Sequence, residues 1–338
     1  MQISELREHV RAQLLGFAWD QWAQMGVFAS SDRRDRWAMD PEALLLFTLE
    51  VGRADARLFE EASDWMVVNE ALIGVRRLRN LCHDAADRAL ADAFLTSVAH
   101  WRPRARLAGK EPPREPNRSE AQPFFRGSIT PIHGPVDAGF LQHGWLKAEV
   151  KPSGKSQPPD LLAPVNFSFR LRQILGVGAR AEVIRVLLTT GWRRPMNQVM
   201  TQVIANAAGY ARRNVQEALH SLNSAGVIIA TRFGNEIRYG VERERWATMM
   251  GLTTDQLPFH RDWPQLLYAL RRLARWLEDT SLDELSPYML ASRARDLADE
   301  IEPALRYAGV HLNEGRQPGA DYWHSFCELA SAALDSLR

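Results

Sequence analysis

Cysteine is scarce in this chain, and its histidines do not form a recognisable metal motif. The 338 residues include two cysteines, Cys82 and Cys327, which lie far apart and belong to no Cys-x-x-Cys pair. His133 and His143 lie among prolines and glycines with Asp137 between them, but the further ligands that a metal site needs cannot be named. The sequence therefore predicts no metal site.

Long apolar runs and enzyme motifs are also missing. No run approaches the roughly 18 apolar residues that cross a bilayer, and the opening MQISELREHV carries charges where a signal peptide is apolar. No P-loop, nucleophile elbow or catalytic carboxylate pair occurs. GVGARA at 176–181 fits the dinucleotide fingerprint, but no carboxylate between Glu182 and Glu217 is available to bind the ribose. We expect a cytoplasmic protein that is not an enzyme, has no cofactor and does not enter a membrane.

The charge is unevenly distributed, although the net charge at pH 7 is only +1. Residues 1–101 carry 11 basic and 16 acidic side chains, and residues 246–338 carry 9 and 14. Residues 102–170 carry 11 and 6, and residues 171–245 carry 11 and 5. A polyanion is therefore attracted to the middle of the chain and repelled by both ends.

The length favours two or three domains, at roughly 100 to 200 residues each. Apolar residues recur at helical spacing through 1–101, which predicts an N-terminal helical domain. Eleven of the eighteen prolines lie between 103 and 164, so 102–170 is predicted to be a basic, proline-rich linker with a small β element. Three amphipathic segments in 258–338 predict a C-terminal helical bundle.

Residues 171–250 combine helical and alternating patterns. The helical segments are AEVIRVLLTTG, MTQVIANAAGY and ARRNVQEALHSLNSAG. Gly209 separates the second from the third, and Gly226 ends the third. VIIATRF and EIRYGVE then alternate like two strands around Gly234 and Asn235. This order is typical of a winged helix-turn-helix domain, so the predicted fold class is mainly α, with this domain between two helical domains.

The third helix has one apolar face and one polar face. Its apolar residues at i, i+3, i+4 and i+7 are Val215, Ala218, Leu219 and Leu222. The residues left outside are Arg212, Arg213, Asn214, Gln216 and His220. Arginine reads guanine and Asn or Gln reads adenine in the major groove. A solvated surface is the alternative, but the preceding turn, the following hairpin and the local positive charge favour DNA binding.

Other basic residues near this helix are candidates for backbone contacts. Arg232 and Arg238 lie on the two strands of the hairpin beside Asn235, and Arg193 and Arg194 follow the first helix. We expect them to contact phosphates or the minor groove. Phosphate contacts supply affinity and salt dependence, whereas base contacts supply sequence preference.

Residues 179–245 resemble the winged helix of bacterial transcriptional regulators of the MarR and ArsR kinds. The matching positions are Ile204, Ala205, Gly209, Val215, Leu219, Leu222, Ala225, Gly226 and Tyr239. Ala211 departs from the pattern, because these proteins often place a capping serine there. The resemblance implies sequence-selective binding of double-stranded DNA by a bacterial regulator. Such motifs often bind paired half-sites as dimers, so we expect a homodimer, with a small-molecule effector or protein partner at the acidic ends.

Two alternatives concern how the helices are used. The winged helix is also compatible with a protein-interaction adaptor, in which the arginines meet an acidic protein surface. NEALIGVRRLRNL, at 69–81, is compatible with a second recognition helix that turns Arg76, Arg77 and Arg79 outward. We favour a packed helical domain there, because its surroundings are acidic and no hairpin follows.

Overall fold

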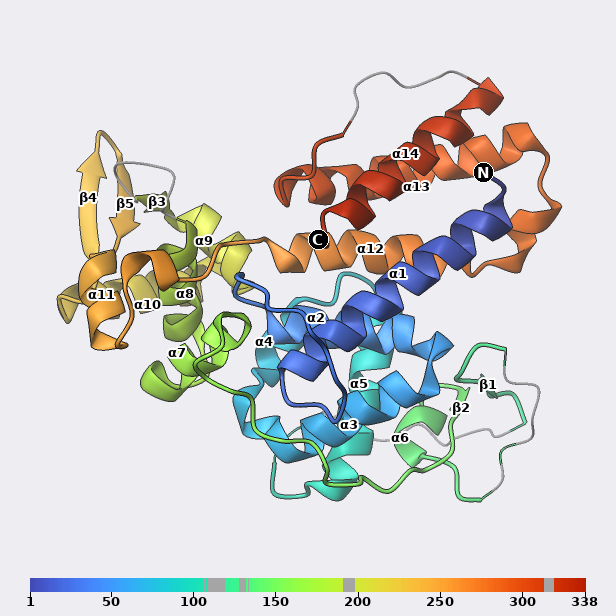
Figure 1. The fold of residues 1–338 in the computed structure, drawn as a ribbon, viewed down its shortest axis with the longest axis horizontal. Coiled ribbons are helices and arrows are strands. Elements are labelled where there is room, and N and C mark those ends of the chain that lie inside the picture. The colour runs from blue at the N-terminus through green and yellow to red at the C-terminus, as the bar shows by residue number, and fades with distance from the viewer. Residues whose placement is uncertain (106, 108–118, 128–131, 133, 191–197, 313–318) are drawn as a thin grey trace.

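The computed structural model describes every residue except 106, 108–118, 128–131, 133, 191–197 and 313–318. The protein is mainly helical, with 63% of its residues in helices. Over the ranges that the structure describes, no helix is both long enough and apolar enough to cross a membrane. Figure 1 shows a small sheet with its helices on the left and a larger, mainly helical part on the right.

The larger part, which we call the platform, is built from both ends of the chain. Its helices are α1 (Ile3–Gln24), α2 (Pro41–Val51), α3 (Ala56–Asn69), α4 (Val75–Asn80), α5 (Ala85–Trp101), α12 (Trp263–Leu277), α13 (Pro287–Tyr307) and α14 (Tyr322–Asp335). Several begin with a capping side chain, as where Asp40 accepts from the amide of Ala43 and Pro41 occupies the first helical position. All three expected C-terminal helices are present.

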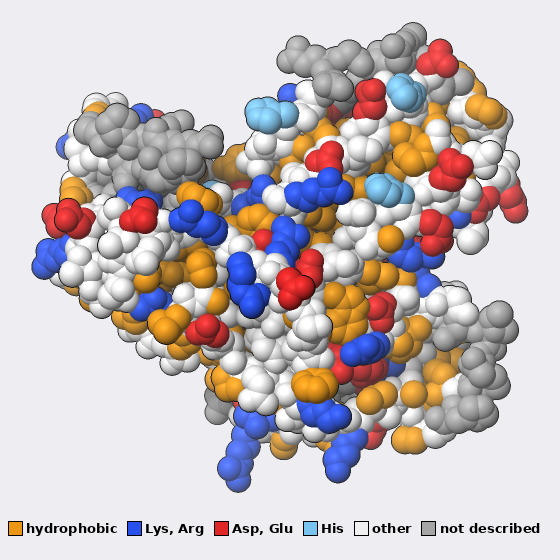
Figure 2. Space-filling model, viewed as in Figure 1, with side chains coloured by type: hydrophobic (Ala, Val, Ile, Leu, Met, Phe, Trp, Pro, Cys, Tyr) orange, Lys and Arg blue, Asp and Glu red, His pale blue; other side chains and the backbone are white. Residues whose placement is uncertain are grey.

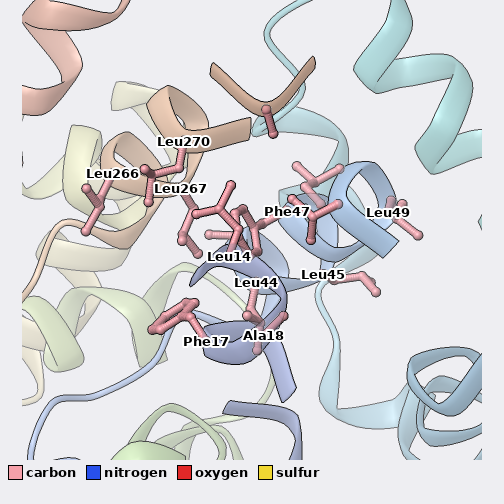
Figure 3. Close-up of a cluster of buried hydrophobic side chains, with 14 of the residues drawn as sticks. Leu14, Phe17, Ala18, Leu44, Leu45, Phe47, Leu49, Leu266, Leu267 and Leu270 are labelled. Carbon is pink, nitrogen blue, oxygen red and sulfur yellow. The ribbon is translucent and has the colours of Figure 1, made fainter. Parts of the chain in front are cut away.

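One hydrophobic core runs through the whole platform. Side chains of α1, α2 and α12 converge in Figure 3, among them Leu14, Phe17, Leu44, Phe47, Leu266, Leu267 and Leu270. The N-terminal and C-terminal helices, which are predicted from the sequence to form two domains, share this core. Helix α12 packs its apolar face against α2, every residue of which is buried.

The described part of the 102–170 segment packs against the platform. Strand β1 (Gln122–Pro123) pairs in parallel with β2 (Trp145–Leu146), and helix α6 (Ala138–Leu141) precedes β2. Phe124 and Phe140 are buried, and their ring centroids lie 4.9 and 5.8 Å from that of Phe59 in α3. A small β element therefore exists as expected, and its aromatic side chains attach it to the platform.

A second hydrophobic core lies under the small sheet. Its elements are α7 (Phe167–Leu175), α8 (Ala179–Thr190), β3 (Val199–Met200), α9 (Thr201–Ala208), α10 (Arg212–Ser224), β4 (Ile229–Phe233), β5 (Glu236–Gly240) and α11 (Arg243–Met249). The sheet is antiparallel in the order β3-β5-β4. The helices α8 to α10 and the hairpin β4–β5 match the expected elements, whereas α7, β3 and α11 were not anticipated.

Candidate nucleic-acid interface

Helix α10 is held by its apolar face, as its spacing predicts. Val215, Ala218, Leu219 and Leu222 are all buried in the second core. The turn before it depends on Gly209, which has a φ of +66° in the left-handed region that favours glycine. Ala211 supplies no side-chain cap, so the first amide groups of α10 have no side-chain acceptor from that position.

The outer face of α10 carries the residues that were singled out as DNA contacts. Arg212, Arg213, Gln216 and His220 are exposed, whereas Asn214 is half-buried on one flank. Arg213 pairs with Glu217 at 3.1 Å, but both side chains are largely exposed, so the pair is weak and easily exchanged. This face is therefore available to a partner.

The hairpin places its two arginines on opposite faces. Arg238 of β5 lies opposite Thr231 of β4, whereas Arg232 lies opposite Ile237, one position along the ladder. Directly opposed residues share a face of the sheet, and the faces alternate along a strand. Arg238 also stacks on Phe233, with its guanidinium carbon 5.0 Å from the ring centroid.

The predicted DNA contacts also include Asn235 in the hairpin turn, together with Arg193 and Arg194. Asn235 is exposed beside Gly234, whose φ of +57° lets the chain reverse. Arg193 and Arg194 lie outside the described residues. On the face shown in Figure 2, basic and acidic side chains are interspersed over the second core.

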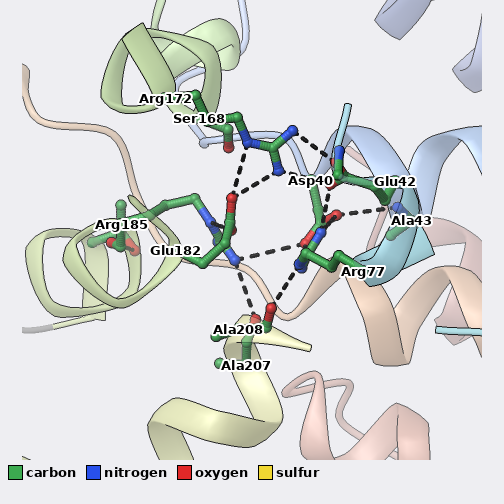
Figure 4. Close-up of polar contacts among 12 residues, drawn as sticks. Asp40, Glu42, Ala43, Arg77, Ser168, Arg172, Glu182, Arg185, Ala207 and Ala208 are labelled. Carbon is green, nitrogen blue, oxygen red and sulfur yellow. Dashed lines mark hydrogen bonds and ion pairs between the residues drawn. The ribbon is translucent and has the colours of Figure 1, made fainter. Parts of the chain in front are cut away.

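A buried ionic network joins the second core to the platform (Figure 4). Its six side chains, each at most 2% exposed, are Asp40, Glu42, Arg77, Arg172, Glu182 and Arg185. The first three belong to the platform, and the last three belong to α7 and α8. Three positive and three negative charges meet here without contact with solvent, so each charge depends on its partners.

Arg77 is the centre of this network. Its guanidinium donates to Asp40 Oδ1 at 2.6 Å, to Glu42 Oε2 at 2.7 Å and, through Nε, to the carbonyl oxygen of Ala208 at 2.6 Å. Ala208 is the last residue of α9, so Arg77 fixes the turn between α9 and α10 against the platform. A Cβ at Gly209 would lie 2.8 Å from Leu81 Cδ2, which shows how closely the turn approaches.

The charges in the network stabilise one another's ionised forms. Burial disfavours the ionised form of Asp40, but the charges and hydrogen bonds of Arg77, together with Arg185, hold its pKa below the ordinary value. Burial also opposes ionisation of Glu182, but the charges of Arg172, Arg77 and Arg185 outweigh this effect and lower the pKa of Glu182 strongly. Asp40 and Glu182 therefore remain ionised at neutral pH.

The alternative of a second recognition helix at 69–81 is wrong for Arg77. Arg77 is completely buried, and Arg79 pairs with Asp92 at 3.1 Å. Arg76 is exposed and forms no hydrogen bond or ion pair with a residue whose position is described. Helix α4 is thus a packed helix in which Arg77 is buried and Arg76 is exposed.

A hollow of about 880 Å³ lies between the platform and the start of α10. Its walls come from the start of α4, from Gly176–Arg180 before and at the start of α8, and from Tyr210, Asn214, Glu217 and Ala218. Asn214 lines it from α10, and Arg76 and Arg180 line it from α4 and α8. The GVGARA segment therefore lines this hollow, and it does not follow a strand of a parallel sheet.

Comparison with protein-family models gives no match, and comparisons with curated proteins and with solved structures give none either. Functional inference thus depends on this geometry.

The cysteines and acidic clusters offer no reactive centre within the described parts of the chain. Burial raises the pKa of Cys82 to about 12 and that of Cys327 to about 11, so both thiols are protonated at neutral pH. No group of three or more His, Cys, Asp or Glu residues is arranged to hold a metal ion among the residues that are described. His133 lies outside the described residues.

The ionic network is not predicted from the sequence, although the sequence carries one signal of it. Glu182 and Arg185 stand three residues apart within AEVIRVLL, and Glu42 precedes the apolar run ALLLF. Charged residues embedded in apolar segments require partners when they are buried. Their partners lie on distant segments, which no local pattern identifies.

Proposed function

We propose that the second core is a winged helix-turn-helix domain that binds double-stranded DNA sequence-selectively, as in bacterial transcriptional regulators of the MarR and ArsR kinds. The observation that carries this proposal is the outer face of α10. Arg212, Arg213, Gln216 and His220 are exposed there, on a helix that Gly209 and a buried apolar face hold in place.

The dimensions and chemistry of α10 suit the major groove. An α-helix is about 10 to 12 Å across, and the groove is about 12 Å wide. In a helix-turn-helix, the start of the second helix contacts base edges. Arg212 and Arg213 occupy that start and Gln216 follows one turn later, whereas Asn214 faces the flank beside the hollow.

The exposed hairpin provides separate backbone contacts. Arg232, Asn235 and Arg238 are near its tip, and the two arginines extend from opposite faces. We assign them to phosphates or the minor groove, where they add affinity without reading sequence. Arg193 and Arg194 remain part of the proposed set.

The proposal includes a homodimer without catalytic activity that acts in the cytoplasm. Helix-turn-helix proteins read paired half-sites with two copies of the domain, and their spacing follows the helical repeat of DNA. The acidic platform is the part available for self-association or for an effector. Analytical ultracentrifugation with and without a palindromic duplex tests the stoichiometry.

A protein-interaction adaptor is the second candidate, and one observation favours it. Met200, Ile229 and Phe233, on one face of the sheet, are 38 to 45% exposed. Clustered exposed apolar side chains often mark a protein interface. Under this proposal the chain ignores duplex DNA even at low salt.

Fluorescence anisotropy against random duplex DNA, followed by selection of a preferred site, tests the DNA proposal. We expect binding that weakens by orders of magnitude between about 50 and 200 mM salt. Arg212→Ala and Gln216→Ala should each weaken binding to the preferred site by roughly 1 to 3 kcal/mol, whereas Arg238→Ala should mainly reduce the salt slope.

The matched control is Arg88→Ala/Arg293→Ala, which removes two exposed arginines from platform helices α5 and α13. This control variant should bind DNA with nearly the same affinity as the natural chain. Equal losses on every sequence for Arg212→Ala, Gln216→Ala and Arg238→Ala would refute the base-reading assignment. Absence of binding at the lowest salt would refute DNA binding itself.

A further inference from the structure

We propose that the DNA contact continues beyond α10 to Arg76 and Arg180, so that the platform and the second core together hold one duplex. This inference rests on the proposed function. It assigns the hollow beside α10 to a phosphate strand, and it gives the platform a direct part in DNA binding.

The hollow brings together the starts of three helices. Arg76 is the second residue of α4, Arg180 is the second residue of α8, and Asn214 is in the first turn of α10. The start of a helix carries a partial positive charge, which favours anions nearby. In α8 and α10, that charge adds to the full charges of the arginines.

The free charge of the hollow is positive. Arg76 and Arg180 are both exposed and form no ion pair or hydrogen bond within the described ranges. Of the two acidic residues that line the hollow, Glu70 accepts from Arg102 at 2.5 Å, whereas Glu217 has a weak, exposed pair with Arg213 at 3.1 Å. When Arg213 contacts DNA, Glu217 loses that partner, and one negative charge then faces the two positive charges of Arg76 and Arg180.

The position of the hollow relative to α10 indicates which anion fits it. When a helix fills the major groove, the sugar-phosphate strands run along both of its flanks, because helix and groove have nearly equal widths. Asn214, Glu217 and Ala218 form the flank of α10 that borders the hollow. A strand on this flank would pass between α10 and the pair Arg76 and Arg180.

The buried network makes this arrangement rigid. Arg77, next to Arg76, bonds to the end of α9, and Arg185, five residues after Arg180, bonds to the carbonyl oxygen of Ala207. The backbone positions of Arg76 and Arg180 are therefore fixed relative to α10. A fixed spacing is what a regular phosphate backbone requires of its contacts.

The test compares salt dependence among double variants of the full chain, with a duplex of the preferred sequence and a random duplex. Each phosphate contact contributes about 0.9 to the slope of log affinity against log salt. Arg76→Ala/Arg180→Ala should therefore reduce the slope by nearly 2, on both duplexes alike. Between 50 and 200 mM salt, the affinity of this double variant should therefore fall by about tenfold less than the affinity of the natural chain.

Three further measurements make the result specific. Arg88→Ala/Arg293→Ala removes the same charge elsewhere on the platform and should leave the slope nearly unchanged. Arg76→Lys/Arg180→Lys should restore most of the slope. Thermal melting should show that the alanine variant folds, since neither side chain has a partner in the described structure.

Different outcomes overturn different claims. If Arg212→Ala/Arg213→Ala weakens binding but Arg76→Ala/Arg180→Ala has no more effect than the control, the extended contact is wrong and the proposed function stands. If inorganic phosphate raises the melting temperature only when Arg76 and Arg180 are present, while the DNA slope is unaffected, the hollow is a small-anion site instead. If the natural chain does not bind DNA, both proposals fail.

Discussion

Replacing Arg77 with alanine should destabilise the protein strongly, whereas replacing its neighbour Arg76 should not. The two arginines are adjacent in sequence, in the same short helix, and differ in what surrounds them. Arg77 is fully buried and bonds to Asp40, Glu42 and Ala208, whereas Arg76 is exposed.

The magnitude follows from the charges that the substitution leaves behind. Without Arg77, Asp40 retains its ion pair with Arg185 at 3.6 Å and its hydrogen bond from the amide of Ala43. One side of its carboxylate then has no positively charged partner. Breaking a buried ion pair by removing one partner costs about 3 to 5 kcal/mol. An exposed substitution such as Arg76→Ala changes stability by about 0.5 kcal/mol or less.

Urea unfolding at pH 7, followed by circular dichroism and tryptophan fluorescence, measures both free energies. If Arg77→Ala does not fold, Arg77→Lys keeps the charge but loses the planar fork, and it should show a smaller loss of the same sign. A loss below about 1 kcal/mol for Arg77→Ala would refute the reasoning, because a buried charge left unpaired costs more than that. Equal losses for the Arg76 and Arg77 variants would refute it too.

Two further predictions concern the backbone turn and the response to pH. Gly209→Ala should cost about 2 to 3 kcal/mol in urea unfolding, from the left-handed φ and the contact with Leu81. Gly226→Ala, with a φ of +68° and open space around its Cβ, should cost only about 1 to 2 kcal/mol, and equal costs would exclude the contact as a cause. Burial, aided by the charge of Arg185, lowers the pKa of His260 to about 3, so the stability that its neutral form contributes is lost as pH falls below about 6.5. Burial raises the pKa of Asp262 to about 6, which acts in the opposite direction, because the stability from its protonated form is lost as pH rises through 6. His260→Gln should therefore gain about 1 to 2 kcal/mol relative to the natural chain between pH 7 and pH 5, and parallel pH profiles of the two proteins would contradict this.

Local patterns in the sequence determined most of the helices and the hairpin. The spacing of Val215, Ala218, Leu219 and Leu222 predicts which face of α10 is buried, and the structure confirms it. Gly209 marks the turn because its conformation is costly for other residues. These features depend on residues close together in the chain, so the sequence alone reveals them.

Short elements escaped prediction because their stability comes from partners. Strand β3 has two residues, Val199 and Met200, and it exists through its pairing with Tyr239 and Arg238 of β5. Helix α11 has seven residues, which is too few for a clear periodic pattern.

Tertiary structure decided which surfaces meet, and therefore where the candidate interface lies. The apolar faces of α2 and α12 are evident in the sequence, but only the fold shows that they join the two ends of the chain in one core. Arg76 and Arg77 are chemically identical in sequence, yet one faces the hollow beside α10 and the other lies in the ionic network. The reason is physical, since the state of a charge depends on burial and on partners that come from distant segments.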